Sequence, residues 1–575
     1  MNLMKRLLAL LLCLVMVLSL AACAAREPAT DESGTQPDAQ TPAGTETKDP
    51  GDQAEEPSGE RPTLTIGVQR KATVEDYETN EFTKYLEEQM NVNLDFVYFS
   101  TDMEEATTQL ALMISGGERL PDILWSFDTI DINLVYEYGE DGYFIDLLDY
   151  FTEENAPHFY DALQYVKESD QAKILNNGKD PTTGELYGMP KYVEGGEDAC
   201  LALVSINQAW LDTLGLEAPT TTEEFRDVLK AFAEKDPNGN GQADEIPAIG
   251  YSGYRGDLVQ FLINAFVYCN DDYFFNATDG KIWTPYNTDE YRQALIYINQ
   301  LVSEGLLNNA TFTIPEKDAD GDLIPYFTPS DGKTITGVIG AHPVLCAEAE
   351  NPALYDYTGL APLKAATDKG GYAPYYAATL KYTSFITSDC ENPDLAFALM
   401  EFMYDADCYR HMRYGIEDTD WRKVTEGKSF TGTDAQFEVL DGTLWSSQNN
   451  HHWHDDACDI STLSYSNAAL FVTDDSWASH MATLCGSCLT AYATMPTPAE
   501  VVNELVYAAD EAEIVSEYAK ILKDYVKQAR ALFATGAMDP NSDSDWQSYL
   551  DALEGQGLSA YTEAAQSAYT RMTAN

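Results

Sequence analysis

Ten residues in the first half of the chain form a loop rich in potential metal ligands. Between Asp236 and Glu245 the sequence reads DPNGNGQADE, in which oxygen-bearing side chains alternate along a glycine-containing turn. Hard oxygen ligands on a tight loop are typical of a calcium site. An EF-hand would need a glutamate at the twelfth position, where Pro247 stands, so we expect a calcium loop of another type; a solvated Asx-rich turn is the alternative. The expected ligands of this structural calcium are Asp236, Asn238, Asn240, Gln242, Asp244 and Glu245.

Three other clusters show metal-type residues in weaker patterns. Consecutive histidines point in different directions, so the HHWHDD run at 451–456 favours a surface loop, or a ligand loop that presents Trp453, over a metal site. Cys485 and Cys488 have the spacing of a redox or zinc motif, but no second pair accompanies them. A local disulfide or free thiols are therefore expected there. The DADGD run at 318–322 lacks closing acids and favours an acidic surface turn.

The elements that must position these residues alternate between strands and helices. Apolar patterns predict strands at 63–68, 92–99 and 122–125, with helices at 80–90 and 103–115 between them. This order implies parallel strands with crossover helices. Ligands of open α/β sheets bind beyond the carboxyl ends of the strands. We therefore expect residues 69–70 and 125–128 to lie near a cleft.

The N-terminal region predicts export and anchoring. Lys5 and Arg6 precede an apolar stretch at 7–20, which is typical of a signal peptide. The following LAAC sequence resembles a bacterial lipobox, so Cys23 is expected to carry acyl chains, palmitate among them, that hold the protein on the membrane. Residues 24–62 have no large apolar side chain and predict a disordered tether.

Charge and motif content exclude several classes of function. With 34 basic and 95 acidic residues, the formal charge of −61 excludes nucleic acid binding. The chain has no G-x-S-x-G, HExxH or phosphate-loop motif. Abundant acids alone do not make the facing pair that a glycosidase needs. Once the signal peptide and Cys23 are set aside, eight of the ten cysteines could form disulfides outside the cell, in pairs that the sequence does not reveal.

Several short motifs, in their order, resemble one known family. They are Tyr187-Gly188-Met189-Pro190, Asn207 with Trp210-Leu211, Leu214-Gly215-Leu216, Pro219-Thr220-Thr221, the calcium-type loop, and Tyr414-Gly415-Ile416-Glu417 with Trp421. Together they resemble the large extracellular solute-binding lipoproteins of bacterial ABC importers, in the carbohydrate-binding branch that includes alginate- and oligosaccharide-binding proteins. Asp418 stands where that family often has glycine, so this loop is expected to differ.

The resemblance implies a type 2 periplasmic-binding-protein fold, with two α/β lobes joined by a hinge and additional C-terminal helices. It also implies capture of an oligosaccharide or modified sugar at the extracellular face of the bacterial membrane and delivery to an ABC permease, without catalysis. An oligopeptide-binding lipoprotein and an anchored glycoside hydrolase are the alternatives. We expect a signal peptide at 1–22, a tether at 23–62, lobe 1 at 63–189, lobe 2 at 190–345, and a return to lobe 1 with cleft-lining segments and C-terminal helices at 346–575.

Sugar recognition depends on aromatic faces, carboxylates and amides. Tyrosines (36) outnumber phenylalanines (22), which suits a wet cleft lined with aromatic rings. At least two aromatic candidates should line the cleft. The candidate ligand-binding residues are Arg70, Trp125, Asp128, Tyr192, Tyr254, Trp283, Trp445 and Trp453.

Overall fold

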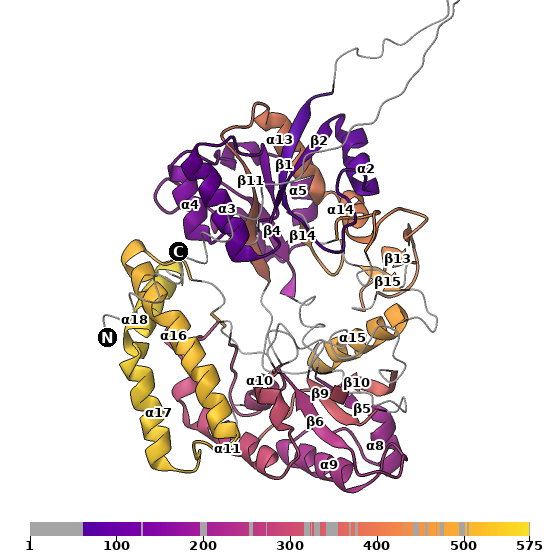
Figure 1. The fold of residues 1–575 in the computed structure, drawn as a ribbon, viewed down its shortest axis with the longest axis vertical. Coiled ribbons are helices and arrows are strands. Elements are labelled where there is room, and N and C mark those ends of the chain that lie inside the picture. The colour runs from indigo at the N-terminus through magenta and orange to yellow at the C-terminus, as the bar shows by residue number, and fades with distance from the viewer. Residues whose placement is uncertain are drawn as a thin grey trace, which may run out of the picture. The chain divides into compact units, whose positions relative to one another are not determined.

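The computed structural model describes residues 61–573, apart from internal gaps (Figure 1). The gaps are 128–129, 196–203, 252–256, 272, 315–322, 324, 327–333, 341–354, 367–369, 374–377, 430–431, 441–447, 455–457, 467, 472–476, 494–500 and 503–504. The signal peptide, the tether, the 318–322 run, Asp128, Tyr254 and Trp445 therefore lie outside the described residues. Within the described ranges, none of the helices combines the length and apolar character that crossing a bilayer requires.

Lobe 1 is built on a six-stranded sheet with the order β14-β4-β11-β3-β1-β2. Strands β1, β2 and β3 run parallel, and the antiparallel β11 separates β3 from β4. The strands are β1 (Thr63–Gln69), β2 (Asn93–Phe99), β3 (Ile123–Trp125), β4 (Met189–Val193), β11 (Thr379–Ile386) and β14 (Ile460–Ser461). The helices are α2 (Glu81–Met90), α3 (Met103–Gly116), α4 (Ile132–Glu140), α5 (Pro157–Leu163), α6 (Glu168–Asn176), α13 (Pro393–Glu401) and α14 (Ala406–Tyr414).

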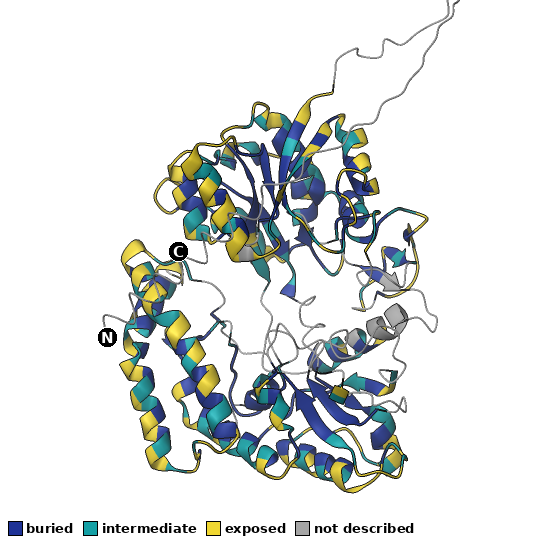
Figure 2. Ribbon diagram, viewed as in Figure 1, coloured by how far each residue is buried: buried dark blue, intermediate teal, exposed yellow. Residues whose placement is uncertain are grey.

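The expected strand–helix alternation of lobe 1 is confirmed, and local chemistry explains its boundaries. Asn80 caps α2 by accepting a hydrogen bond from the backbone N–H of Phe82. Gly117 ends α3 with a φ of 66°, a conformation that costs glycine little. Figure 2 shows the sheet strands largely buried beneath these helices, as parallel strands covered on both faces should be.

Lobe 2 is built on a second, four-stranded sheet with the order β10-β5-β9-β6. Its strands are β5 (Val204–Asn207), β6 (Ile246–Gly250), β9 (Thr336–Gly340) and β10 (Tyr357–Gly359), with a hairpin of β7 (Asn276–Thr278) and β8 (Lys281–Trp283). Its helices are α8 (Gln208–Leu214), α9 (Thr222–Glu234), α10 (Leu258–Asn264) and α11 (Asp289–Ser303). Thr221 and Glu224 form a reciprocal capping box that fixes the start of α9.

The remaining elements are a small sheet and four helices. The sheet has the order β12-β13-β15, from Trp421–Lys423, Phe437–Val439 and Ala469–Phe471. The helices are α15 (Trp477–Ala493), α16 (Ala509–Ala534), α17 (Asp543–Gly555) and α18 (Leu558–Thr573). Short 3-10 turns occupy Leu148–Tyr150, Pro285–Asn287, Asn309–Phe312 and Phe402–Tyr404.

The expected lobe boundaries are corrected in two places. Strand β4 pairs with β11 in the lobe 1 sheet, so lobe 2 begins after Val193 and not at residue 190. Strand β10 pairs with β5 in lobe 2, with Tyr357 opposite Asn207, so the return to lobe 1 comes after 359 and not at 346. Hydrogen-bond register decides both boundaries, and local sequence patterns carry no register information for partners so far apart.

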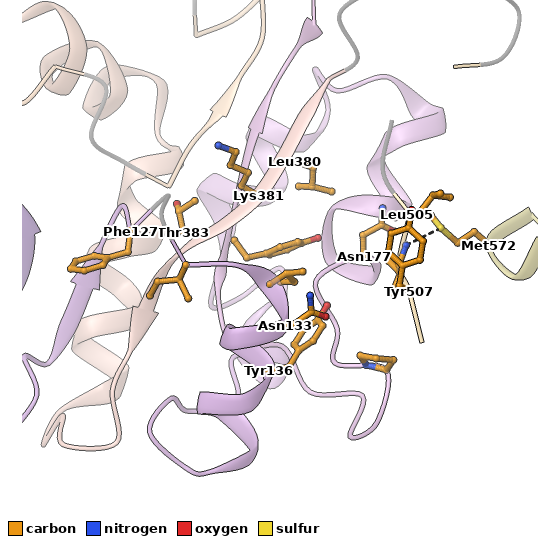
Figure 3. Close-up of a pocket in the computed structure, with 15 residues that line it drawn as sticks. Phe127, Asn133, Tyr136, Asn177, Leu380, Lys381, Thr383, Leu505, Tyr507 and Met572 are labelled. Atoms are coloured by element: carbon orange, nitrogen blue, oxygen red, sulfur yellow. Dashed lines mark hydrogen bonds between the residues drawn. The ribbon is translucent and has the colours of Figure 1, made fainter. Parts of the chain in front are cut away.

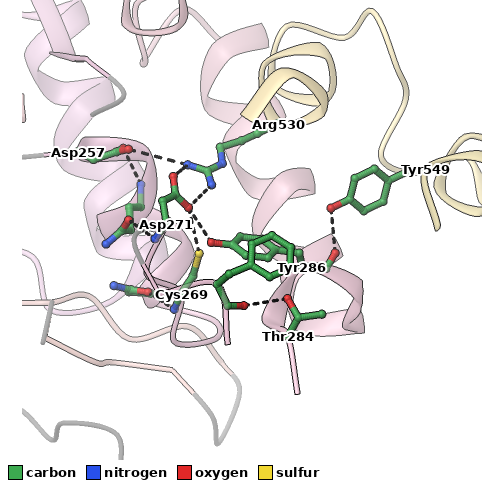
Figure 4. Close-up of polar contacts among 10 residues, drawn as sticks. Asp257, Cys269, Asp271, Thr284, Tyr286, Arg530 and Tyr549 are labelled. Atoms are coloured by element: carbon green, nitrogen blue, oxygen red, sulfur yellow. Dashed lines mark hydrogen bonds and ion pairs between the residues drawn. The ribbon is translucent and has the colours of Figure 1, made fainter. Parts of the chain in front are cut away.

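The C-terminal helices share the hydrophobic core of lobe 2, and a buried ion pair secures α16 there (Figure 4). Arg530 is 2% exposed, and its guanidinium donates to both carboxylate oxygens of Asp271 at 2.8 and 2.6 Å. Asp257 lies 3.8 Å away, and the Tyr286 hydroxyl also donates to Asp271 at 2.8 Å. Burial alone would raise the pKa of Asp271, but the charge and hydrogen bonds of Arg530 outweigh it and hold that pKa below its usual value.

Candidate ligand-binding site

The carboxyl ends of the parallel strands meet at one edge of the lobe 1 sheet. Trp125 is the last residue of β3, and the chain then turns at Ser126, which has a φ of 54°. The backbone N–H of Ser126 donates to the Ser384 hydroxyl at 3.0 Å, and that of Phe127 donates to the Thr383 carbonyl at 2.6 Å. Because β11 is antiparallel to β3, the first residues of β11 lie at this same edge.

A pocket of about 330 Å³ opens at this edge (Figure 3). One wall comes from lobe 1, from the loop after β3, helix α4 and the start of β11. The opposite wall comes from the segment 505–507 and from Met572 on α18. Leu505 and Tyr507 also pack against the lobe 2 core, so the two walls belong to different hydrophobic cores.

The lining of the pocket combines aliphatic and aromatic side chains and is uncharged except for one lysine. Tyr136 and Tyr507 line the pocket, with amides and hydroxyls among the other lining groups, whereas Phe127 borders it with a ring that is 0% exposed. Lys381 is the one charged side chain among the described residues of the lining, which include no carboxylate. Burial, together with the nearby charges of Asp180 and Asp131, raises the pKa of Tyr136 to about 12, so its hydroxyl stays protonated and can donate.

One polar atom of the lining has no partner within the protein. The Thr383 hydroxyl is buried and makes no hydrogen bond to any described residue. A buried hydroxyl without a partner is unfavourable by roughly 1–3 kcal/mol. Because this oxygen has almost no accessible surface, a ligand could satisfy it only if the pocket wall shifted on binding.

A second exposed patch lies at the same edge of the sheet, beside β1 and β2. Tyr98 is 42% exposed, and its ring stacks on that of Phe96 with centroids 6.3 Å apart. The Arg70 guanidinium lies 5.7 Å from the Tyr98 ring centroid. Burial of the ring, and then the charges of Glu78 and Asp76, raise the pKa of Tyr98. Sequence reasoning selected Arg70 but missed Tyr98, whose signal was its place near the carboxyl end of β2.

Three of the predicted ligand-binding aromatics are core residues, and their assignment is corrected. Trp125, Tyr192 and Trp453 are 1%, 2% and 0% exposed. The Trp453 ring packs edge-on against Phe82 and Trp125, and its indole N–H donates to the Thr83 hydroxyl at 3.0 Å. Rings that other side chains cover in this way offer no face to a sugar.

The remaining predicted residues are separated in the structure. Trp283 lies half-buried in the β7–β8 hairpin, where its indole N–H donates to the Thr278 hydroxyl at 3.0 Å. Trp283 lies away from the residues that line the pocket. In the 451–454 loop, His451 pairs with Asp420 at 2.9 Å and His452 is buried, so this loop folds against lobe 1.

The predicted calcium loop folds around its own acids. The Asp236 carboxylate accepts hydrogen bonds from the backbone N–H groups of Asn240 (3.0 Å) and Gly241 (2.8 Å), and the Asn240 amide donates to Asp244 at 3.1 Å. Glu245 keeps one buried carboxylate oxygen without a hydrogen-bond partner among the described residues. Burial, and then the charges of Asp244 and Asp236, raise the pKa of Glu245.

Acidic side chains alone do not complete a metal site here. In the described part of the chain, no three His, Cys, Asp or Glu side chains gather closely enough to hold an ion. A calcium ion in this loop would therefore also need the amide oxygens of Asn238, Asn240 and Gln242.

Four of the described cysteines, Cys269, Cys390, Cys408 and Cys458, are free thiols. Burial raises the pKa of Cys458 to about 12, so its thiol stays protonated and unreactive.

Comparisons with known proteins agree with this architecture. The fructooligosaccharide ABC transporter substrate-binding protein FusA of Streptococcus pneumoniae is 26% identical over 503 residues, which cover 85% of this chain and 86% of FusA. The polygalacturonan/rhamnogalacturonan-binding protein YtcQ of Bacillus subtilis is 24% identical over 361 residues, 61% of this chain and 66% of that protein.

Solved structures show the same two-lobed fold. An extracellular solute-binding protein from Bifidobacterium longum subsp. infantis superposes with a TM-score of 0.70 at 21% identity and covers 88% of this chain and 98% of its own. FusA from S. pneumoniae in complex with kestose gives a TM-score of 0.67 at 21% identity, with 89% and 100% coverage. The profile of the bacterial extracellular solute-binding protein family matches residues 71–407, more than half of the chain. The chain therefore belongs to the bacterial extracellular solute-binding proteins.

Proposed function

We propose that this protein captures an oligosaccharide outside the cell and delivers it, chemically unchanged, to an ABC permease. The observation that carries this proposal is the pocket at the carboxyl edge of lobe 1, where aromatic and aliphatic side chains lie beside amides and hydroxyls. Pyranose and furanose rings present apolar faces to aromatic side chains and hydroxyls to amides. Near full-length similarity to a fructooligosaccharide-binding protein supports the same ligand class.

The two walls of the pocket explain how binding could drive closure. The lobe 1 wall includes Thr383, whereas Tyr507 on the other wall packs against the lobe 2 core. A glycan that contacts both walls binds the closed arrangement more tightly than an open one. That difference in affinity shifts the protein towards the closed form, which is the form that a permease would recognise.

The charge distribution favours an uncharged glycan. The chain carries a formal charge of −61, and Lys381 is the one cation in the described lining of the pocket. A polyuronate brings a negative charge on each sugar, so repulsion from the protein would oppose its approach. Neutral oligosaccharides avoid this penalty, and their affinity should depend little on ionic strength.

Calorimetry with neutral and acidic glycans tests the proposal. We expect neutral oligosaccharides such as fructooligosaccharides to bind and polygalacturonate to bind weakly or not at all. Thr383→Val should weaken neutral-glycan binding roughly five-fold, the value of a hydrogen bond of about 1 kcal/mol, and leave the stability of the unliganded protein unchanged or slightly higher. Binding of peptides alone would overturn the proposal, and release of shortened glycan products would replace it with hydrolysis.

We also propose that the loop at 236–245 holds a structural calcium ion. The buried, unpaired oxygen of Glu245 and the nearby charges of Asp244 and Asp236 support this assignment, because a divalent cation would neutralise them. Asn238 ties the loop to the chain two residues before β9, since its amide donates to the Thr334 carbonyl at 3.3 Å. Calcium at 100-fold its dissociation constant should stabilise the protein by about 2.7 kcal/mol, and Glu245→Gln should reduce this effect. Equal thermal unfolding with calcium and with chelator would exclude a calcium site.

We propose, finally, that Cys23 anchors the mature protein to the outer face of the bacterial membrane. The charged and apolar stretches before Cys23, and the tether after it, support this assignment. Labelled palmitate should be incorporated into the wild-type protein and not into Cys23→Ala, which should appear in the medium. Retention of the variant on the membrane would contradict lipid anchoring.

A further inference from the structure

One wall of the pocket is a short segment without helix or strand structure. Residues 505–507 precede α16 and line the pocket opposite lobe 1. The segment cannot hold its shape through helix or strand hydrogen bonds, so neighbouring side chains must fix it. These neighbours lie on α18, the last helix of the chain.

Arg571 on α18 makes the strongest of these contacts. Its guanidinium donates to both oxygens of the Glu511 carboxylate at 3.0 and 2.6 Å, and to the Val506 carbonyl at 3.0 Å. Glu511 in turn accepts the backbone N–H of Ala508 at 2.8 Å. The planar guanidinium thus joins the wall segment to the first turn of α16 in one fixed geometry, which a flexible ammonium could not reproduce.

Two further side chains of α18 support the same segment. The Val506 backbone N–H donates to the Met572 sulfur at 3.4 Å, and Met572 itself lines the pocket. Tyr561 lies beside Tyr507: burial, and then the proximity and hydrogen bond of Tyr561, raise the pKa of Tyr507. The wall therefore takes its shape from α18 and not from the lobe 1 residues that it faces.

We propose that Arg571 is a positioning residue of the ligand pocket, which holds the 505–507 wall in the conformation that binds glycan. Arg571 does not line the pocket itself. Its effect on binding is indirect and works through the position of Tyr507 and its neighbours. This inference rests on the proposed carbohydrate function and assigns the C-terminal helix a part in it.

The test compares Arg571→Ala with a matched control, Arg292→Ala. Arg292 on α11 also links the C-terminal helices to lobe 2, through the Pro540 carbonyl at 2.9 Å and the Asp543 carboxylate at 2.9 Å, but neither Arg292 nor these partners line the pocket. Both variants remove an arginine that joins a carbonyl to a carboxylate. The thermal midpoint and the glycan dissociation constant are measured for each full-length protein.

We expect the two variants to lose similar thermal stability but to differ in binding. If the wall is correctly placed only about one tenth of the time without Arg571, the dissociation constant rises roughly ten-fold. Arg292→Ala should bind as wild type does, and Glu511→Ala should reproduce the weaker binding of Arg571→Ala. The double variant Arg571→Ala/Glu511→Ala should then be no weaker than either single variant.

The outcomes separate this inference from the function on which it rests. A wild-type protein that binds no glycan would refute the proposed function. A wild-type protein that binds glycan, together with an Arg571→Ala variant of unchanged affinity, would overturn the positioning role alone. Equal losses of affinity in Arg571→Ala and Arg292→Ala would also overturn it, because the effect would then come from general loosening of the C-terminal helices.

Discussion

Replacing Asp271 by asparagine should loosen the long C-terminal helix from lobe 2. The substitution keeps the size of the side chain but removes the charge that neutralises Arg530. Arg530 is 2% exposed, so water cannot replace the lost carboxylate at the guanidinium. The nearest remaining acid is Asp257, at 3.8 Å.

The structure sets the size of this effect. Removing one partner of a buried ion pair costs about 3–5 kcal/mol, because the other charge stays desolvated. Asp257 still offers partial compensation, and the Asp271 side chain is itself 35% exposed, so we expect the lower end, about 3 kcal/mol. The lost free energy comes from the contact between α16 and lobe 2, so it should be measured as a change in the free energy of opening of α16.

Amide hydrogen exchange along α16 is the suitable assay. A loss of about 3 kcal/mol should speed exchange of the buried part of the helix roughly 100-fold if local opening limits exchange. Lys520 and Asp524 form an exposed pair on the same helix, with side chains 82% and 65% exposed. Asp524→Asn is therefore the matched control, with an expected change below about 0.5 kcal/mol.

The pH dependence of the effect has a defined sign. The pKa of Asp271 lies below its usual value, so the pair contributes fully above about pH 4 and is lost as pH falls through the lower folded pKa. The difference between wild type and Asp271→Asn should thus be constant near neutral pH and should shrink in acid. Similar exchange in Asp271→Asn and Asp524→Asn would refute the reasoning.

Two further predictions concern lobe 1. Trp453→Phe should lower the free energy of unfolding by about 1–2 kcal/mol, because the smaller ring leaves a void and the Thr83 hydroxyl loses its hydrogen-bond donor. Calorimetry should find the glycan affinity unchanged. A loss of affinity without a loss of stability would instead show that Trp453 contacts the ligand. The hydrogen bond to the Glu401 carboxylate raises the pKa of His158 against the effect of burial, so its stabilising contribution is complete below about pH 6.5 and is lost as pH rises through the raised folded pKa. Thermal midpoints between pH 5 and 9 should show this decline in the wild type and a flatter profile in Glu401→Gln, and parallel profiles would contradict it.

The elements of lobe 1 were predictable because their signals are local. Alternating apolar runs and helical periodicity gave β1, α2, β2, α3 and β3 to within about two residues. The expected additional C-terminal helices are present, among them the long α16, Ala509–Ala534. Family resemblance supplied the two lobes, and the family profile confirms it.

The side chains that face the ligand were harder to predict, for a physical reason. Strands of a parallel sheet are covered on both faces, so an aromatic side chain within a strand is buried whichever way it points. Trp125, the last residue of β3, is 1% exposed, and Phe127, two residues later, borders the pocket but is 0% exposed. A sequence pattern that places a residue near the carboxyl end of a strand does not show whether its side chain is exposed to the pocket or buried in the core.

The far wall of the pocket was beyond sequence reasoning because its neighbours are distant in the chain. Tyr507 lies opposite side chains such as Phe127 and Thr383, and Arg571 on the last helix holds its segment. No periodicity or spacing connects these three regions. The contact between them exists only after both cores have formed.

The origin of the two walls has a consequence for transport. A ligand shifts a conformational equilibrium only by its difference in affinity between the two states. A glycan that touched the exposed Tyr98 and Arg70 patch alone would contact lobe 1 alone and would bind open and closed forms equally. Such a glycan could be retained at the surface but would not favour the closed form. Only a ligand long enough, or suitably placed, to meet both Thr383 and Tyr507 would do so, and the selection of substrates for import therefore depends on the wall that the C-terminal helices supply.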